Sequence, residues 1–519
     1  MKGKIHSLLF FFALISFESV RAQTPSIQWE KTFGTSNDEQ ATCTQQTVDG
    51  GYIVVGSARY TNNGVAGNHG GYDFWVLKLS SSGTSQWQQC YGGSSDDMAY
   101  CVQQTTDGGY IVSGSTVSSD GQVTGLHPSP GNPLWGDYWI VKIDSAGILQ
   151  WQKTLGGSGF DEAHSITQTT DGGYVVLGVT NSGDGDFVNG GNIIKLSSTG
   201  VIEWNSYQGG VNNYSVKPTT DGGYIVAGTI LNQFSVLKLD SLGSHQWWKF
   251  YGGGGFDQAN SAMQTADGGY IVAGYIQSND GDVTGSHGGT ADAWVIKLDS
   301  SGNLQWQKAL GGSYDDEANS IKQTIDGGYI IACVTNSDDG DVNGLHGVAG
   351  AGGNGGSVYD YWVVKINSAG IIEWQKPMGG SYIDKANSIA PTTDGGYIVA
   401  GATVNNVVND GDVTGFHVET TNPNVSGYDY WIVKLAPEVT TSIENNNISL
   451  ITASPNPASN SIHIEGLANK ITNIQLLNAL GVTVRNWINI SKKDIDISDL
   501  PDGVYFLIAD NSYFKIIKK

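Results

Sequence analysis

Short runs of alternating apolar and polar residues, separated by turns rich in Gly, make up most of the chain between residues 26 and 436. In 292–332, for example, "WVIKL" and "LQWQKAL" flank the turn "DSSG", and "ANSIKQT" and "YIIA" flank the turn "IDGG". A period of two marks a β-strand, and such turns join antiparallel neighbours into hairpins. Asp-Gly-Gly suits the turn because Gly adopts positive φ without a steric cost. The pattern predicts two hairpins, hence four antiparallel strands, in each unit.

Three anchors count the units, because each occurs seven times in a fixed order. The first is the Asp of a "DGGY" turn, the second is a Trp that precedes this turn, and the third is a Lys that follows it. They are Asp49, Asp107, Asp171, Asp221, Asp267, Asp326 and Asp394; Trp29, Trp87, Trp151, Trp204, Trp247, Trp306 and Trp374; and Lys78, Lys142, Lys195, Lys238, Lys297, Lys365 and Lys434. Consecutive turn Asp residues are 46 to 68 residues apart, which fits propeller blades with insertions rather than a β-helix.

The anchors at the two ends of this region predict how it closes. Trp29 comes before any DGGY turn, and no Trp anchor follows Lys434. Seven units are complete only if the N-terminal Trp strand joins the last one, an arrangement that leaves no open sheet edge. We therefore predict an all-β fold: a seven-bladed β-propeller over residues 23–436, closed by its N-terminal strand and followed by a small C-terminal β-sandwich.

The repeats also resemble a known bacterial family. "DAWVIKLDSSGNLQWQKALGGSYDDEANSIKQTIDGGYIIA" (292–332) is similar to the seven-bladed β-propeller repeat, with its D-x-[WF]-V-x-K-L strand, G-G-S-x-x-D loop and D-G-x-Y strand. The similarity covers roughly residues 26–436 and implies the fold. It implies no activity, because propellers carry many unrelated functions.

The sequence changes character after residue 436. Residues 437–447 form a polar linker, and residues 448–519 contain short alternating runs with Pro-Asn and Pro-Asp-Gly turns, which predict the small β-sandwich. The strings "SPNPAS", "LNALGVTV" and "LPDGVYFL" resemble the type A C-terminal sorting domain of the type IX secretion system of Bacteroidota. The resemblance implies that residues 448–519 engage the type IX machinery, direct the protein across the outer membrane and are commonly removed there.

Residues 1–22 are typical of an export signal. Lys2 and Lys4 precede the apolar run "LLFFFALI", and "VRA" at 20–22 is a small-residue cleavage pattern. The run is too short for a bilayer, which takes about 20 apolar residues, and no later stretch is apolar enough. The sequence therefore predicts a protein that is secreted or attached to the outer-membrane surface, with no transmembrane segment.

Charge limits the ligands. The chain carries a net charge of −23 at pH 7, and residues 23–437 alone carry −24. Nucleic acids and anionic membranes require basic patches, so this excess of acid excludes them and favours cations or neutral ligands.

Four cysteines remain after export. Cys43 and Cys101 occupy the same place in successive repeats and could form a disulfide between neighbouring strands if their Cα atoms lie within about 7 Å. The alternative is that these two, with Cys90 and Cys333, are all free thiols.

The repeats differ most between the second and third strands. Asp221 and Lys238 are 17 residues apart in the fourth unit, whereas Asp394 and Lys434 are 40 apart in the seventh. Variable loops on a rigid frame are the usual place for binding. We call the face that carries these loops the varied face, and the opposite face, built from DGGY and DSSG turns, the turn face. The residues of the varied face that break the repeat are our candidate ligand contacts: Trp135, Phe160, Tyr382 and Glu419.

Three of the variable loops share a motif that suits calcium: "DGDVTGSH" (280–287), "DGDVNGLH" (339–346) and "DGDVTGFH" (410–417). D-x-D-x-[NT]-G is the first half of a calcium loop, although the bidentate Glu of position 12 is missing. The candidate ligands are Asp280, Asp282, Thr284, Asp339, Asp341, Asn343, Asp410, Asp412 and Thr414. The alternative is that these residues only bond their own backbone. A His ends each string, but on separate units these His residues cannot share a transition-metal site, and no other cofactor is predicted.

An Asp before the first strand recurs in six units. These residues are Asp38, Asp97, Asp161, Asp257, Asp316 and Asp384. A row of carboxylates suggests glycoside chemistry, which uses two acids about 5–9.5 Å apart. A catalytic pair should break the repeat, however, so capping of backbone N–H groups explains the row better. In the same way, the seven Trp should pack between units, and the seven Lys should extend over apolar surface to a neighbouring carboxylate.

These observations favour a binding or adhesion module on the cell surface, with a glycan or a protein as its ligand. The first alternative is a polysaccharide-active enzyme, such as an endoglucanase-like glycoside hydrolase, that uses carboxylates of the varied face. The second is a structural component of a surface layer. We assign no catalytic residue, since the chain contains no G-x-S-x-G, H-E-x-x-H or phosphate-loop motif.

Overall fold

The computed structural model divides the chain into two units, Met1–Thr440 and Thr441–Lys519, which are described separately. The described residues are 23–35, 37–59, 65, 67–127, 129, 132, 135–187, 191–207, 211–350, 358–404, 409–417, 427–438, 452–454, 457–465, 473–478, 483–488, 494–509 and 512–519. The predicted export signal, residues 1–22, lies outside them.

The described part of the first unit contains seven four-stranded antiparallel sheets and one short hairpin. Sheet 1 is β2 (Glu39–Gln46), β3 (Tyr52–Arg59), β4 (Tyr72–Leu79) and β5 (Ser85–Tyr91); sheet 2 is β6 (Asp97–Gln104), β7 (Tyr110–Thr116), β8 (Asp137–Ile143) and β9 (Leu149–Leu155); sheet 3 is β10 (Asp161–Gln168), β11 (Tyr174–Thr180), β12 (Gly191–Leu196) and β13 (Ile202–Tyr207); sheet 4 is β14 (Asn212–Pro218), β15 (Tyr224–Ile230), β16 (Gln233–Leu239) and β17 (His245–Tyr251). Sheet 5 is β18 (Asp257–Gln264), β19 (Tyr270–Ile276), β20 (Asp292–Leu298) and β21 (Leu304–Leu310); sheet 6 is β22 (Asp316–Gln323), β23 (Tyr329–Thr335), β24 (Asp360–Ile366) and β25 (Ile372–Met378); sheet 7 is β26 (Asp384–Pro391), β27 (Tyr397–Thr403), β30 (Asp429–Leu435) and β1 (Ile27–Phe33). The hairpin is β28 (Asn409–Asp410) and β29 (Val413–Thr414).

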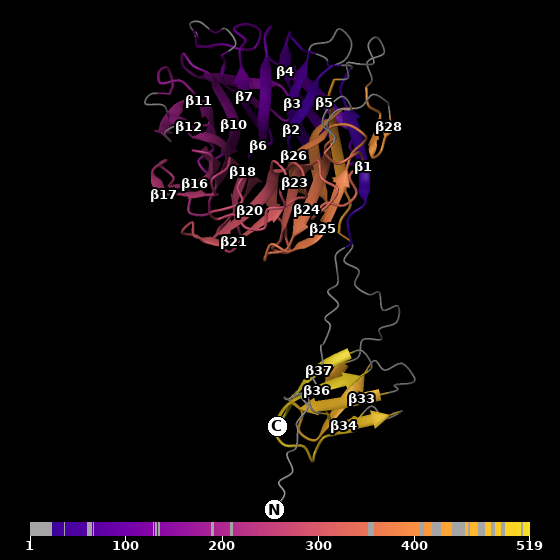
Figure 1. Ribbon diagram of the computed structural model, residues 1–519. Helices are drawn as coiled ribbons and strands as arrows, with labels where there is room; N and C mark the ends of the chain where they lie inside the picture. Colours follow the sequence, from indigo (N-terminus) through magenta and orange to yellow (C-terminus); the bar gives the residue numbers. More distant parts are fainter. Residues whose placement is uncertain are drawn as a thin grey trace, which may run out of the picture. The chain divides into compact units, whose positions relative to one another are not determined.

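The sheets follow one another around a common centre, with the first strand of each sheet innermost (Figure 1). The ring closes where the anchors predicted. β1 pairs antiparallel with β30, with Trp29 opposite Lys434. On the inside, Asn387 Nδ2 of sheet 7 donates to the Ala41 carbonyl of sheet 1 at 2.8 Å. The two ends of this region, far apart in sequence, are therefore joined at both the outer and the inner strand.

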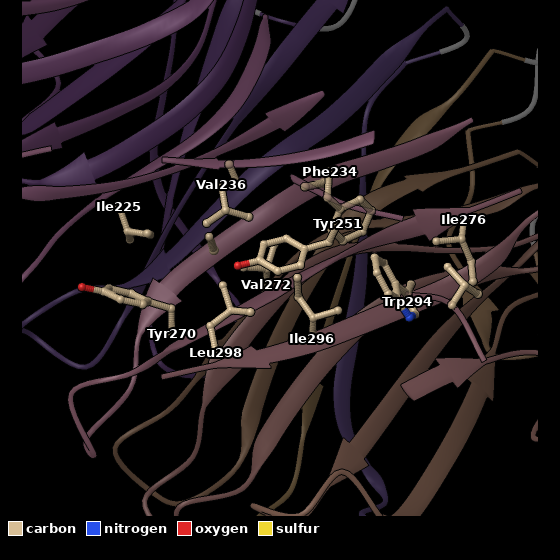
Figure 2. Packing of buried hydrophobic residues seen from close by; sticks show 14 of the residues in the cluster. Ile225, Phe234, Val236, Tyr251, Tyr270, Val272, Ile276, Trp294, Ile296 and Leu298 are labelled. Atoms are coloured by element: carbon tan, nitrogen blue, oxygen red, sulfur yellow. The ribbon is translucent and has the colours of Figure 1, made fainter. Parts of the chain in front are cut away.

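Apolar residues between successive sheets form the core. In Figure 2, Phe234 and Val236 of sheet 4 lie in one cluster with Trp294 and Ile296 of sheet 5, and all four are fully buried. Burying an apolar side chain of this size stabilises the fold by about 1.5–3 kcal/mol. The third strand β24 is buried at every position because clusters form on both of its faces. Each sheet thus depends on its neighbours for its core.

The Trp anchors lie between sheets, as predicted. Each Trp of an outer strand packs against the Tyr of the DGGY turn in the next sheet, with ring centroids 5.5–6.3 Å apart. Trp29 and Tyr52 make this contact between sheets 7 and 1. The tilted and edge-on geometries are those that aromatic pairs prefer.

The Lys anchors also behave as predicted. Every one of them is buried, and its Nζ lies 2.7–3.0 Å from the Asp of the DGGY turn in its own sheet. The stem of each Lys lies within the apolar sheet while the ammonium reaches the half-exposed turn. The repeated turn is thereby pinned to the third strand.

The second unit contains a three-stranded and a four-stranded sheet. Their strands are β31 (Thr452–Ser454), β32 (Ser461–Glu465) and β35 (Asp494–Asp496), and β33 (Asn473–Asn478), β34 (Thr483–Ile488), β36 (Gly503–Ala509) and β37 (Ser512–Lys518). One apolar cluster joins the two sheets through residues such as Ile462, Ile474 and Leu507.

Candidate functional site: the inner strands and the varied face

The inner strands are tied together by side chains rather than by a backbone ladder. The fourth residue of the inner strand donates to the carbonyl of the third residue in the next sheet. Thr42, Asn260, Asn319 and Asn387 make this bond at 2.8–3.0 Å. A bulge after the third residue of six inner strands shifts the register at this point, and the same bulge follows the second residue of β14, which begins one residue later in the repeat. The inner ring is therefore a repeated structural device, and departures from it are candidates for function.

Sheets 2, 3 and 4 carry an aromatic cluster at the equivalent position, which is the fourth residue of β6 and β10 and the third residue of β14. The imidazole of His164 lies between Tyr100 and Tyr214, with ring centroids 5.2 and 5.0 Å away. Its Nε2 is 3.2 Å from Oε1 of Glu162, which is two residues earlier on the same strand. The cluster replaces the small polar residues that the inner ring has at sheets 1, 5, 6 and 7.

Burial shifts the protonation equilibria of this cluster. It lowers the pKa of His164 to about 4, so the imidazole is neutral at pH 7. Burial also raises the pKa of Glu162, although a hydrogen bond from Tyr100 opposes the shift. Sequence reasoning missed these residues because they lie inside a regular repeat. The signal was present, since "DEAHSITQ" (161–168) differs from "DEANSIKQ" (316–323) at His164 and Thr167.

A polar pocket of about 290 Å³ opens between sheets 6 and 7, and we call it the Tyr359 pocket. Its lining residues are Asp315, Glu317, Asn319, Val334, Tyr359, Lys385 and Asn387. The Tyr359 hydroxyl donates to Asp315 Oδ2 at 3.1 Å, and Lys385 Nζ lies 5.8 Å from the centre of the Tyr359 ring. Burial raises the pKa of Glu317, and the charge of Lys385 opposes this. The pocket thus combines one aromatic ring, two carboxyl groups, two amides and one cation.

The four candidate ligand contacts are not brought together. Trp135 is exposed and Phe160 is half-buried, and their segments adjoin because the Asp161 N–H donates to the Gly136 carbonyl at 2.9 Å. Tyr382 lies elsewhere, beside the Tyr359 pocket: its carbonyl accepts the Tyr359 N–H at 3.2 Å. Glu419 lies outside the described residues.

The first Asp of each candidate calcium string caps the loop that enters the same sheet. Asp280, Asp339 and Asp410 accept the N–H groups of Gly254, Ser313 and Ser381, respectively, at 2.6–2.7 Å.

The remaining residues of the strings have separate partners. Asp282 accepts the Gly252 N–H at 3.3 Å, Asp341 lies 3.5 Å from Lys308, and Asp412 lies 3.4 Å from His346. Thr284 bonds Gln307, the Asn343 carbonyl accepts from Gln375 at 3.0 Å, and Thr414 bonds Glu30. Within the described ranges, no group of three or more His, Cys, Asp or Glu is placed to hold a metal ion.

Each His that ends a string pairs with an Asp of its own sheet. His346 Nδ1 is 2.7 Å from Asp360, and His417 Nδ1 is 2.8 Å from Asp429. These hydrogen bonds raise the pKa of both His residues. His69 and His127 make the same contact at 2.7 Å with Asp73 and Asp137. The second ring nitrogen of His127, His287 and His346 lies 3.4–3.7 Å from an Asp of the next sheet, so these three His residues link neighbouring sheets.

The Asp that begins the inner strand is a cap, as predicted, in five sheets. Asp97, Asp161, Asp257, Asp316 and Asp384 accept the N–H of the Gly four residues earlier at 2.7–3.0 Å.

The prediction for sheet 1 was wrong by one residue. There Glu39, which begins β2, accepts the Thr35 N–H at 2.6 Å. Asp38 instead accepts the Tyr72 hydroxyl at 3.1 Å and the Tyr428 N–H at 3.2 Å. The longer Glu side chain occupies the strand-start position, so Asp38 faces the varied side.

Comparison with known proteins identifies the tail. Residues 453–519 match the family model described as secretion system C-terminal sorting domain. The tail is a type IX sorting domain. The sorting domain directs export, so the protein is secreted or displayed on the cell surface. No described residue belongs to a helix with the length and apolarity that a membrane crossing requires.

The chain is similar to solved structures at low identity. Virginiamycin B lyase from Staphylococcus aureus is 10% identical, with a TM-score of 0.45, and the alignment covers 78% of this chain and 99% of that one. The Dos1 propeller is 11% identical, with a TM-score of 0.40 and coverages of 79% and 96%. The extracellular domain of a hybrid two component system from B. thetaiotaomicron is 11% identical, with a TM-score of 0.40, and the alignment covers 95% of this chain but 60% of that one. A search of the curated proteins finds no match.

Proposed function

We propose that the mature protein is a seven-bladed β-propeller, closed by β1, that acts as a binding or adhesion module outside the cell. The sorting domain would be the β-sandwich that engages the type IX machinery. Seven sheets that share their cores with both neighbours support the blade count, and the Trp29–Tyr52 contact at the last junction supports closure.

The Tyr359 pocket is the observation that carries the binding function. Its ring, amides and carboxyl groups converge from two sheets on a space of about 290 Å³, which is close to the lower limit for small-ligand sites. Carboxyl and amide groups bond sugar hydroxyls, and a Tyr ring offers an apolar face to a sugar ring. The net charge of −23 disfavours polyanions. A neutral glycan is therefore the ligand class that fits best.

One observation favours the enzymatic alternative. Asp315 and Glu317 both line the pocket, and the pKa of Glu317 is raised, as the general acid of a glycoside hydrolase requires. The repeated strand-start Asp residues do not support this alternative, because Asp97, Asp316 and Asp384 are fully buried and bond backbone N–H groups.

A glycan panel separates these possibilities. The full-length mature protein is passed over immobilised neutral glycans, and bound protein and new reducing ends are both measured. Retention without cleavage, reduced at least tenfold by Tyr359→Ala, supports binding. New reducing ends that disappear in Glu317→Gln support the enzyme. No retention of any glycan, together with ordered self-association, would favour a surface-layer component.

Two variants control for position and fold. Tyr72→Ala removes a Tyr that contacts Asp38 in sheet 1 as Tyr359 contacts Asp315 in sheet 6. Ile325→Ala changes a fully exposed residue of a DGGY turn, on the turn face. Neither should alter retention. Equal losses in Tyr72→Ala and Tyr359→Ala would place the ligand elsewhere on the varied face.

A further inference from the structure

The fifth residue of the inner strand breaks the repeat in two adjacent sheets. Five sheets have Ser there: Ser165, Ser215, Ser261, Ser320 and Ser388. The hydroxyls of Ser165, Ser215, Ser261 and Ser388 accept a backbone N–H from the inner strand of the next sheet at 3.1–3.3 Å. Sheets 1 and 2 have Cys43 and Cys101 instead. Sulfur is a weak acceptor, and here each thiol instead donates to a carbonyl of the next inner strand at 3.7–3.8 Å. These long contacts replace the N–H bond that Ser accepts elsewhere.

The fold holds the two cysteines side by side. The Thr42 hydroxyl donates to the Ala99 carbonyl at 2.9 Å just before them, and the Gln104 N–H donates to Gln45 Oε1 at 2.8 Å just after them. Between these two bridges the Cys43 thiol donates to the carbonyl of Val102, the residue after Cys101, at 3.8 Å, and the Cys101 thiol donates to the Ile166 carbonyl at 3.7 Å. Neither cysteine is in a disulfide. Cys101 is nearly buried, whereas Cys43 is only half-buried.

Two lysines act electrostatically on this thiol pair. Lys217 of β14 and Lys322 of β22 lie close enough to influence both cysteines and each other. Burial, and then the charge of Lys217, lower the pKa of Lys322 to about 8. Among the described residues, neither ammonium has a carboxylate within 4 Å. The thiol pair is therefore the negative partner that the structure offers them.

This environment favours a thiolate on Cys101. The neighbouring Cys43 thiol, helped by the charges of Lys217 and Lys322, lowers the pKa of Cys101 to about 5 against the opposing effect of burial. The thiolate is the reactive form of Cys. Cys90 and Cys333 lie in a different environment, because burial raises the pKa of both thiols.

We propose that Cys101 and Cys43 form a thiol–disulfide exchange site that accepts small external disulfides and closes into a disulfide between sheets 1 and 2. The Cys101 thiolate attacks one sulfur of the external disulfide, whose S–S bond breaks and releases one thiolate. Cys43 then attacks Cys101 in the mixed disulfide, the second external thiolate leaves, and the Cys43 proton passes to a leaving thiolate. The protein loses two electrons and two thiols, and the external disulfide is reduced to two thiols. Exported proteins meet the oxidising conditions that this step needs.

The test uses the reduced full-length protein and 2-hydroxyethyl disulfide as the probe. We expect the intact mass to fall by two hydrogens and a peptide map to join residues 43 and 101. Cys43→Ser, which restores the Ser of five other sheets, should instead accumulate the mixed disulfide on Cys101. A protein that keeps all four thiols, or that reacts as fast at Cys90 or Cys333, overturns the proposal.

A second measurement tests the role of the lysines. The rate of Cys101 alkylation by iodoacetamide at pH 6 is compared in the Cys43→Ser background with and without Lys322→Met. We expect the rate to fall about tenfold, because less thiolate is present when a neighbouring cation is lost. An unchanged rate would overturn the assignment of Lys322. The denatured protein, in which the four thiols react alike, serves as the control.

Discussion

Two rows of Asp circle the same ring of sheets and have opposite electrostatics. The turn row, represented by Asp267, lies at the half-exposed DGGY turns, where each Asp meets a buried Lys. Burial opposes ionisation there, but hydrogen bonds from Thr265 and Lys297 outweigh it and lower the pKa of Asp267 to about 2. The junction row, represented by Asp316, begins the inner strands. Asp316 is fully buried, and burial raises its pKa to about 7 despite hydrogen bonds from Thr335, Gly312 and Ser337.

The difference comes from the neighbours rather than from the residue type. A Lys supplies the opposite charge in the turn row. At the junction the carboxyl groups of Asp316 and Asp292 both lie against Gly311, and the charge of Asp292 raises the pKa of Asp316 further. A buried carboxyl group beside another one favours its neutral form. Asp267 in the turn row is therefore charged at neutral pH. Asp316 in the junction row bonds a backbone N–H group and is protonated far more easily.

The largest expected effect is in the turn row. Asp267→Asn should lower the free energy of unfolding by about 3 kcal/mol, because it leaves the buried Lys297 ammonium without a negative partner. Urea unfolding at pH 7 measures this. Asp316→Asn is the matched junction variant and should cost less than about 1 kcal/mol at the same pH. Lys297→Met combined with Asp267→Asn should recover most of the loss. Equal costs for the two single variants would remove the distinction between the rows.

The stability of the fold should depend on pH in opposite directions for the two rows, because the pKa is raised for Asp316 and lowered for Asp267. The pKa of Asp316 rises from 3.8 in the unfolded chain to about 7 in the folded protein. Its contribution to the stability of the fold is therefore complete below pH 3.8 and is lost as the pH rises through 7. Between pH 5.5 and 8.5, wild type should therefore lose about 2 kcal/mol relative to Asp316→Asn. For Asp267, with a folded pKa of about 2, stability is present above 3.8 and lost as the pH falls toward 2. Asp267→Asn should show no such change relative to wild type in the window from 5.5 to 8.5.

His164 is a buried base, and burial shifts its pKa in the direction opposite to that of the buried Asp316. Its folded pKa of about 4 lies below the usual 6.5, so its contribution to stability is present above 6.5 and lost as the pH falls through 4. His164→Asn introduces the residue that Asn260 and Asn319 provide in sheets 5 and 6. Between pH 7 and pH 5 we expect this variant to gain about 2 kcal/mol of stability relative to wild type. Thermal melts of both proteins at pH 5 and 7 measure this gain.

The smallest effect is expected for calcium. Asp280, Asp339 and Asp410 already accept backbone N–H groups, so removal of metal by EDTA should shift the melting temperature by less than about 1 °C. A ligand bound only by the native state must stabilise it. A larger fall, reversed by calcium but not by magnesium, would show instead that the strings bind the ion as the sequence motif suggests.

The sequence was most informative where a residue recurs with one spacing. The Trp and Lys anchors predicted the packing between sheets and the ion pairs, because a side chain repeated at one place in a strand meets the same neighbours each time. It was least informative where one unit differs from the rest. His164 is a single change within a regular strand. The DGD strings allowed either a calcium loop or capping of their own backbone, and only the structure shows that Asp280 and Asp339 accept backbone N–H groups.

The sequence by itself determined the strands, the turns, the number of repeats and the sorting domain, since these depend on local periodicity and on motifs of adjacent residues. Only the tertiary structure decided which Asp is charged, which loop residues meet and that Cys43 and Cys101 lie side by side under the charge of lysines from other sheets. Protonation and reactivity depend on burial and on charges from strands far apart in the chain, and a linear repeat does not encode those distances.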